Sequence, residues 1–183
     1  MSSEPPPDEA PRAPAPEMTV PEALAWGVKL HQAGRLPEAE ALYSRILAAS
    51  PDQPDAWHFL GLIAHQAGRG EQAVEWIRRA TLLAPDHAAA HHNLGNVFRE
   101  QGRLAEAHAC FVRVLALAPN QASTHNNLGI VLKEQGRLEE AAASFQRALS
   151  LQPGYVDARY HLGNVLVRRE RFGEARAAFQ KVI

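Results

Sequence analysis

Nine histidines and one cysteine are the side chains of this 183-residue sequence most able to hold a metal ion or act as nucleophiles. His91 and His92 are adjacent, and neighbouring residues on a helix point about 100° apart, so these two imidazoles cannot share one ion. His87 lies close to His91 in the sequence, but no carboxylate or third histidine stands at ligand spacing from them. Cys110 has apolar neighbours, which favours inert packing over a reactive thiol. The sequence therefore predicts no metal site.

The local sequence motifs of common enzymes are missing. There is no glycine-rich phosphate loop that ends in Lys-Ser or Lys-Thr, and no Gly-x-Ser-x-Gly nucleophile elbow. A single cysteine leaves no intrachain disulfide and no zinc site built on cysteines. We therefore expect a chain that is not an enzyme and that carries no cofactor.

The overall charge is close to balanced, with 19 lysines and arginines against 20 aspartates and glutamates. A protein that neutralises many phosphates needs a clear basic excess, so this balance argues against a nucleic-acid partner. It also gives no basic patch for an anionic membrane, and no apolar run approaches the ~20 residues of a membrane-spanning helix. The start of the sequence lacks the basic and apolar regions of a signal peptide. We expect a soluble, cytoplasmic protein.

Residues 1–19 differ in composition from the rest of the chain. Six prolines interrupt every possible helical turn, and four acidic residues stand against one arginine, which gives this segment a charge of −3. Such a segment buries too little apolar surface to offset its ordering entropy, so we expect a disordered, proline-rich acidic tail. The alternative is that its prolines form a polyproline II ligand for a proline-binding domain.

From residue 20 onward the sequence repeats with a period of 34 residues. A period of roughly 20–50 residues indicates a solenoid or a propeller. Four residue types recur every 34 residues independently of one another, and a biased composition alone does not produce such regularity. They are the glycines Gly27, Gly61, Gly95, Gly129 and Gly163, the alanines Ala39, Ala73, Ala107, Ala141 and Ala175, the arginines Arg35, Arg69, Arg103, Arg137 and Arg171, and the prolines Pro51, Pro85, Pro119 and Pro153.

Each repeat is predicted to contain two helices joined by a tight turn. In the third repeat, Leu94 and Phe98 share one helical face, Gly102 interrupts the pattern, and Phe111 belongs to a second apolar stripe. Pro119 closes the repeat, because a helix cannot continue there. The recurring glycine of the first helix would normally cost about 1 kcal/mol in a helix interior. Its presence in every repeat therefore indicates close packing of one helix against the other.

This pattern resembles the tetratricopeptide repeat, whose signature is Trp-x2-Leu-Gly-x2-Tyr, then Ala-x3-Phe, then Pro. The second repeat carries it at Trp57, Leu60, Gly61, Ala73, Ile77 and Pro85, and the third at Leu94, Gly95, Phe98, Ala107, Phe111 and Pro119. The resemblance implies an all-α, right-handed superhelical solenoid of five helix-turn-helix repeats. Their expected boundaries are 20–53, 54–87, 88–121, 122–155 and 156–183, and the last repeat is incomplete.

The incomplete last repeat is expected to leave an apolar face without a neighbour, because each repeat of such an array covers the next. Ala175, Phe179 and Val182 would then face water. Two alternatives stay open. Either the chain is a fragment of a longer protein, or the uncapped C-terminal helix mediates end-to-end self-association.

In tetratricopeptide proteins the first helix of each repeat lines a concave groove that binds polypeptides, so the resemblance implies a protein–protein interaction module. The side chains expected in this groove become rich in amides and mildly basic in the third and fourth repeats. Asparagine can both donate to and accept from the backbone of an extended peptide. The candidate peptide-binding residues are Asn93, Asn96, Asn126 and Asn127 at the centre and His92, Arg99, Lys133 and Tyr160 at the edges.

Two functional subtypes of the family can be compared with these residues. Grooves that bind chaperone tails use lysines and arginines at positions that hold His92, Asp157 and His161 in this chain, so that subtype is not expected. The pair Asn93 and Asn127 is similar to the asparagine ladder that precedes the catalytic domain of protein O-linked N-acetylglucosamine transferases and their bacterial relatives. A scaffold that holds an extended polypeptide is the preferred interpretation. The alternative is the substrate-binding arm of a larger glycosyltransferase, truncated here.

Overall fold

The structure is a computed structural model that describes residues 18–180, and these residues form ten α-helices. Consecutive helices pair as hairpins, α1 with α2 through to α9 with α10. The helices are α1 (Val20–Gln32), α2 (Leu36–Ala49), α3 (Pro54–Gln66), α4 (Gly70–Leu83), α5 (Ala88–Glu100), α6 (Leu104–Leu117), α7 (Ala122–Glu134), α8 (Leu138–Leu151), α9 (Val156–Arg168) and α10 (Phe172–Gln180).

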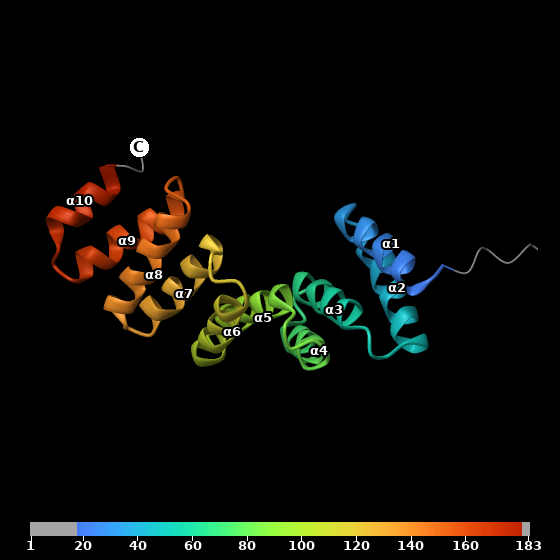
Figure 1. The fold of residues 1–183 in the computed structure, drawn as a ribbon. Helices are drawn as coiled ribbons and strands as arrows, with labels where there is room; N and C mark the ends of the chain where they lie inside the picture. Colours follow the sequence, from blue (N-terminus) through green and yellow to red (C-terminus); the bar gives the residue numbers. More distant parts are fainter. Residues whose placement is uncertain (1–17, 181–183) are drawn as a thin grey trace, which may run out of the picture.

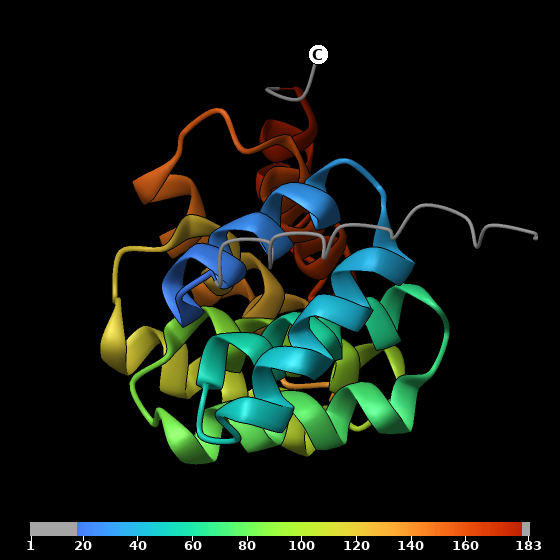
Figure 2. The same cartoon turned by 90° about the vertical axis from the view of Figure 1, so that its right-hand side faces the viewer.

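The hairpins stack in sequence order into a right-handed superhelix, with α1 and α10 at opposite ends (Figure 1). Each second helix also packs against the first helix of the next hairpin, as α2 does on α3 and α8 does on α9. Viewed along the array, the hairpins wind around a common axis (Figure 2). Within residues 18–180, contacts that skip a helix occur only between odd-numbered helices. The first helices therefore lie on the inner, concave side, as the tetratricopeptide resemblance implies.

The turn inside each hairpin depends on one residue in the left-handed backbone region. Gly34, Gly68, Gly102 and Gly136 hold this place in the first four hairpins, with φ between 72° and 77°. Glycine adopts this conformation freely because it has no Cβ, so it can end the first helix and reverse the chain at once. In the fifth hairpin the same place is held by Glu170, at φ 60°. A side chain in this conformation costs about 1–2 kcal/mol.

A second glycine in each repeat lets the two helices of a hairpin approach closely. A Cβ at Gly129 would lie 2.7 Å from Cε1 of Phe145, and a Cβ at Gly95 would lie 2.8 Å from Cε1 of Phe111. Both rings are fully buried and have no room to withdraw. Equivalent contacts join Gly27 to Tyr43, Gly61 to Ile77 and Gly163 to Phe179. The close helix packing predicted from this glycine is confirmed.

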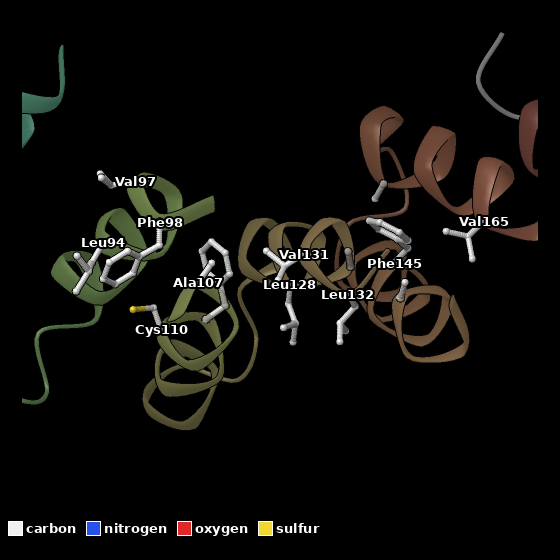
Figure 3. Packing of buried hydrophobic residues seen from close by; sticks show 14 of the residues in the cluster. Leu94, Val97, Phe98, Ala107, Cys110, Leu128, Val131, Leu132, Phe145 and Val165 are labelled. Carbon is white, nitrogen blue, oxygen red and sulfur yellow. The ribbon is translucent and has the colours of Figure 1, made fainter. Parts of the chain in front are cut away.

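The core is a continuous apolar layer between neighbouring helices. The recurring alanine of each second helix is at most 2 % exposed. In Figure 3, Leu94 and Phe98 of α5 lie near Cys110 of α6, and the layer continues through Leu128, Val131 and Leu132 of α7 to Phe145 of α8 and Val165 of α9. Burying one such leucine or phenylalanine contributes about 1.5–3 kcal/mol. Burial also raises the pKa of the Cys110 thiol to about 11, so the sulfur stays protonated at neutral pH.

One hydrogen bond ties each repeat from the second to the fifth to the proline near the end of the repeat before it. The fourth residue of the repeat faces that proline carbonyl with a side-chain nitrogen. The pairs are Trp57 with Pro51 at 2.8 Å, His91 with Pro85 at 3.1 Å, His125 with Pro119 at 2.9 Å, and Arg159 with Pro153. Tryptophan, histidine and arginine differ in shape, but each can present an N–H donor. The variation at this signature position therefore preserves the hydrogen bond.

The last hairpin corrects one expectation about exposed side chains. Ala175 is 2 % exposed because it packs inside its own hairpin, so the prediction that it faces water is wrong. Phe179 is half-buried, with its ring against Gly163. Val182 lies outside the described residues.

Most of the predicted tail, residues 1–17, also lies outside the part of the chain that the structure describes. Its last two residues are described, and Thr19 precedes the first residue of α1. The backbone N–H of Thr19 donates to the carboxylate of Glu22 at 2.8 Å, which satisfies one of the donors that a helix start leaves open. This hydrogen bond caps the start of α1.

Candidate functional site

The candidate site is the concave groove, which the inner faces of α1, α3, α5, α7 and α9 form. Between the third and fourth repeats the surface is hollowed by a cavity of about 230 Å³. It is lined by Ala88, Ala89, His92, Asn93, Gln121 and Ser123. Two of the predicted binding residues, His92 and Asn93, thus border an open depression where α5 meets α7.

A first hydrogen-bonded pair joins the second repeat to the third. Asn93 Nδ2 lies 2.8 Å from Nε2 of His58, which is only 4 % exposed. Burial lowers the pKa of His58 to about 4, and the nearby His87, which pairs with Asp55 at 3.0 Å, adds to this effect. His58 is therefore neutral at pH 7, and its Nε2 can accept the amide hydrogen of Asn93.

A second network joins the third repeat to the fourth through three of the predicted residues. Asn127 Nδ2 donates to Asn96 Oδ1 at 3.0 Å and lies 3.3 Å from His92 Nε2. Asn96 Nδ2 lies 3.4 Å from the other ring nitrogen of His92. Burial lowers the pKa of His92, so the neutral ring accepts from one of these amides at a time. The network holds Asn127 in a fixed orientation on the groove floor.

Three histidine–asparagine pairs recur at equivalent positions of neighbouring repeats, and in the third pair the histidine and the asparagine have exchanged places. His58 and Asn93, His92 and Asn127, and Asn126 and His161 are each 35 residues apart, so all three pairs occupy the same two positions of neighbouring repeats. In the last pair, however, Asn126 Oδ1 and His161 Nδ1 are buried without a hydrogen-bond partner among residues 18–180. Asn126 is 4 % exposed and interacts with Tyr155, whose pKa burial raises. Asn126 is therefore placed beneath the groove surface.

Positive charge gathers where α5, α7 and α9 meet. Burial lowers the pKa of His161, and Lys133 and Arg99 lower it further, whereas Asp157 opposes them. Lys133 forms no ion pair in the described part of the chain. Arg99 lies 3.9 Å from the Glu100 carboxylate, and its buried Nε has no hydrogen-bond partner there. Two cations in the groove thus have little internal compensation.

The structure separates the predicted site residues into groups. It joins His92, Asn96 and Asn127 in one network and places Arg99 and Lys133 farther along α5 and α7, where both lower the pKa of His161. Tyr160 is exposed at the end of the groove, with its ring centroid 6.1 Å from that of Phe179. Sequence analysis did not identify His58 and His161 as members of the histidine–asparagine pairs that recur 35 residues apart. The spacing of 35 residues between a histidine and an asparagine was the available signal.

The described residues form neither a cluster that could hold a metal ion nor a helix that could cross a membrane. Between residues 18 and 180, no group of three or more His, Cys, Asp or Glu side chains is placed to hold a metal ion. None of the ten helices there combines the length and the apolar character that crossing a bilayer requires.

Comparisons with known proteins identify the repeats. Models of the tetratricopeptide repeat match residues 21–63, 52–120, 92–156 and 126–183. The chain belongs to the tetratricopeptide repeat family. Its signature glycines, alanines and prolines therefore have the packing roles described above, and the tetratricopeptide groove is the concave surface formed by the first helices. No curated protein matches the chain.

Solved tetratricopeptide structures superimpose well on this chain. MamA shares 24 % identity, with 85 % of this chain and 91 % of MamA covered and a TM-score of 0.80. A MamA fragment from Desulfovibrio magneticus RS-1 shares 23 % identity, with 89 % and 92 % covered and a TM-score of 0.82. YrrB, described as a tetratricopeptide protein with an unusual peptide-binding site, shares 21 % identity, with 90 % and 85 % covered and a TM-score of 0.80. At these identities the likeness shows the fold alone.

Proposed function

We propose that this chain is a protein–protein interaction module that holds an extended polypeptide in its concave groove. The observation that carries the proposal is the network of His92, Asn96 and Asn127 on the floor of an open groove, with Lys133, which forms no ion pair within residues 18–180, farther along α7. Fixed amide groups near cations that have little internal compensation suit recognition of a polar polypeptide, because they present oriented hydrogen-bonding atoms without rearrangement. The tetratricopeptide fold and the peptide-binding description of YrrB support the same function.

The hydrogen bonds inside the network determine which atoms remain for a ligand. Asn127 Nδ2 donates to Asn96 Oδ1, and its second hydrogen is used as well when Nε2 is the ring nitrogen of His92 that accepts. Its Oδ1 is then the atom left to accept a backbone N–H from a bound peptide. An extended peptide presents its N–H and C=O groups on alternating sides, so one asparagine can hold it irrespective of its sequence.

The charges in the groove give this peptide a preferred composition. Arg99 lies about one turn beyond Asn96 on α5, and Lys133 lies between one and two turns beyond Asn127 on α7. A carboxylate on the bound segment would pair with them. We infer that the groove favours extended segments that carry an acidic side chain.

An array of short unstructured peptides of varied net charge tests this proposal with the full chain. Lys133→Glu should weaken the binding of acidic peptides about tenfold, which corresponds to ~1.4 kcal/mol. Lys29→Glu is the matched control, because Lys29 is exposed on α1 and forms no ion pair within residues 18–180. Equal binding by both variants, or no binding of any peptide by the natural chain, would contradict the proposal.

Three further hypotheses from the sequence concern a larger enzyme, self-association and cellular location. The matched family models and the similar structures named above lend no support to an arm of a glycosyltransferase. Self-association through the C-terminal helix and a cytoplasmic location stay predictions.

A further inference from the structure

A second cleft lies away from the concave groove, on the surface between α3 and α4. It has a volume of about 460 Å³ and is lined by Trp57 of α3 and by Glu75, Trp76, Arg78, Arg79 and Leu82 of α4. Both indoles pack against the hydrophobic core on one side and border the cleft on another. Leu82 is 72 % exposed, the largest value among the exposed large apolar side chains described. An aromatic and aliphatic surface is therefore open to solvent here.

The charged residues around this cleft are basic in sum. Arg78 and Arg79 stand against one carboxylate, that of Glu75, which gives the lining a charge of 2 − 1 = +1. Neither guanidinium forms an ion pair with any residue between 18 and 180. Flat proline rings pack well on tryptophan faces, and proline-rich segments recognised in this way enter with little conformational entropy to lose. The cleft thus fits a proline-rich segment that also carries carboxylates.

The chain itself contains one segment of this chemistry. Residues 4–17 hold six prolines, and Pro11 and Pro14 have the Pro-x-x-Pro spacing of polyproline II ligands. Four acidic residues and one arginine give the segment a charge of −3, opposite to that of the cleft. We propose that the proline-rich acidic segment 4–17 docks in the cleft between Trp57 and Trp76 of the same molecule, with its carboxylates on Arg78 and Arg79.

The segment is long enough to reach the cleft within one molecule. Seventeen residues precede Met18, and in a polyproline II conformation they span about 50 Å. Three successive helix contacts lead from α1 to α4, and at about 8–10 Å each they separate the two helices by at most about 30 Å. The N-terminal segment therefore has length to spare, and its prolines rather than its last residues would occupy the cleft.

The indole N–H resonances of the full chain provide a direct test. The sequence has three tryptophans, so Trp57 and Trp76 report on the cleft and Trp26 on α1 serves as an internal control. The full chain is compared with a full-length variant that carries Pro6→Ser, Pro7→Ser, Pro11→Ser and Pro14→Ser. The expected result is a resolved shift of the Trp57 and Trp76 resonances between the two chains and no shift of the Trp26 resonance.

Charge reversal then tests the ionic part of the contact. In a chain with Arg78→Glu and Arg79→Glu, the proline substitutions should no longer move the Trp57 and Trp76 resonances. The control reverses two exposed arginines elsewhere, Arg45→Glu and Arg168→Glu, and should retain the shift. Unchanged resonances for Trp57 and Trp76 in the first comparison would overturn the proposal. A shift that grows with protein concentration would also overturn it, because the segment would then come from a second copy.

Discussion

Glu170 is the one described residue with a side chain in the left-handed backbone region, and glycine holds its place in the other four hairpins. Glu170→Gly should therefore raise the free energy of unfolding by about 0.5–1 kcal/mol, because the strain of φ 60° disappears. The reverse change in the fourth hairpin, Gly136→Ala, should lower it by about 1 kcal/mol. Urea denaturation of both variants measures these changes. A less stable Glu170→Gly chain would show that the turn carries no strain.

His58 should make the stability of the protein depend on pH. Burial lowers its pKa from 6.5 to about 4, so the unfolded chain binds the proton more tightly than the folded chain. Its contribution is therefore complete above pH 6.5 and is lost as the pH falls from there toward 4. The loss over this range is on the order of 3 kcal/mol. Protonation would also turn Nε2 into a donor and break the hydrogen bond from Asn93.

The variant His58→Asn isolates this effect, because asparagine is the residue that Asn126 supplies at the equivalent position. We expect the natural chain to lose more unfolding free energy than the variant between about pH 7 and pH 4.5. Urea denaturation at the two pH values gives both numbers. If the two chains lost the same amount, His58 would not be the titrating group, and His92 and His161 would have to account for the change.

At the scale of one hairpin, the close contact between helices rests on glycine. Gly129→Ala would place a methyl group 2.7 Å from the buried ring of Phe145. The overpacking should outweigh the better helix propensity of alanine, for a net loss of about 1–2 kcal/mol. Gly173→Ala makes the same exchange within α10, where nothing lies within 4 Å, and should be neutral or slightly stabilising. Thermal unfolding measures the change in stability of both variants. If both substitutions changed the stability in the same direction, the packing role of Gly129 would be refuted.

The link between successive repeats depends on a donor and not on a particular ring. His125→Phe keeps an aromatic ring but removes the N–H that faces the Pro119 carbonyl, so it should cost about 1 kcal/mol of stability. His125→Trp restores a donor of the kind that Trp57 supplies and should lie within a few tenths of a kcal/mol of the natural chain. Chemical denaturation compares the three chains. Equal stability of both variants would mean that this hydrogen bond contributes nothing.

Helices and turns were predictable because their signals are local. The 34-residue period, the turn glycines and the closing prolines each act within a few residues of where they stand, so the sequence alone indicates two helices per repeat. Trp57, His91 and His125 hold the same position in successive repeats, and in the sequence the two histidines appeared as departures from the family signature. Their explanation requires the neighbouring repeat, since the acceptor is a carbonyl six residues earlier in the chain.

At the scale of the whole molecule, the groove was predictable as a location but not as a set of contacts. The family resemblance places the first helices on the concave side, and the structure does the same. The resemblance alone could not show that Asn93 is paired with His58, or that Asn126 is buried beneath the groove surface. These outcomes depend on the stagger between repeats, which brings the fifth residue of one repeat to the sixth residue of the next.

The central claim is that a polypeptide binds the concave face, and mapping the backbone amide resonances tests it most directly. The full chain is titrated with an acidic peptide selected from the array described above. We expect the resonances that shift to belong to α5, α7 and the start of α9, and we expect Lys133→Glu to weaken the effect. Shifts confined to α4, α6 and α8 would place the ligand on the outer face and contradict the account.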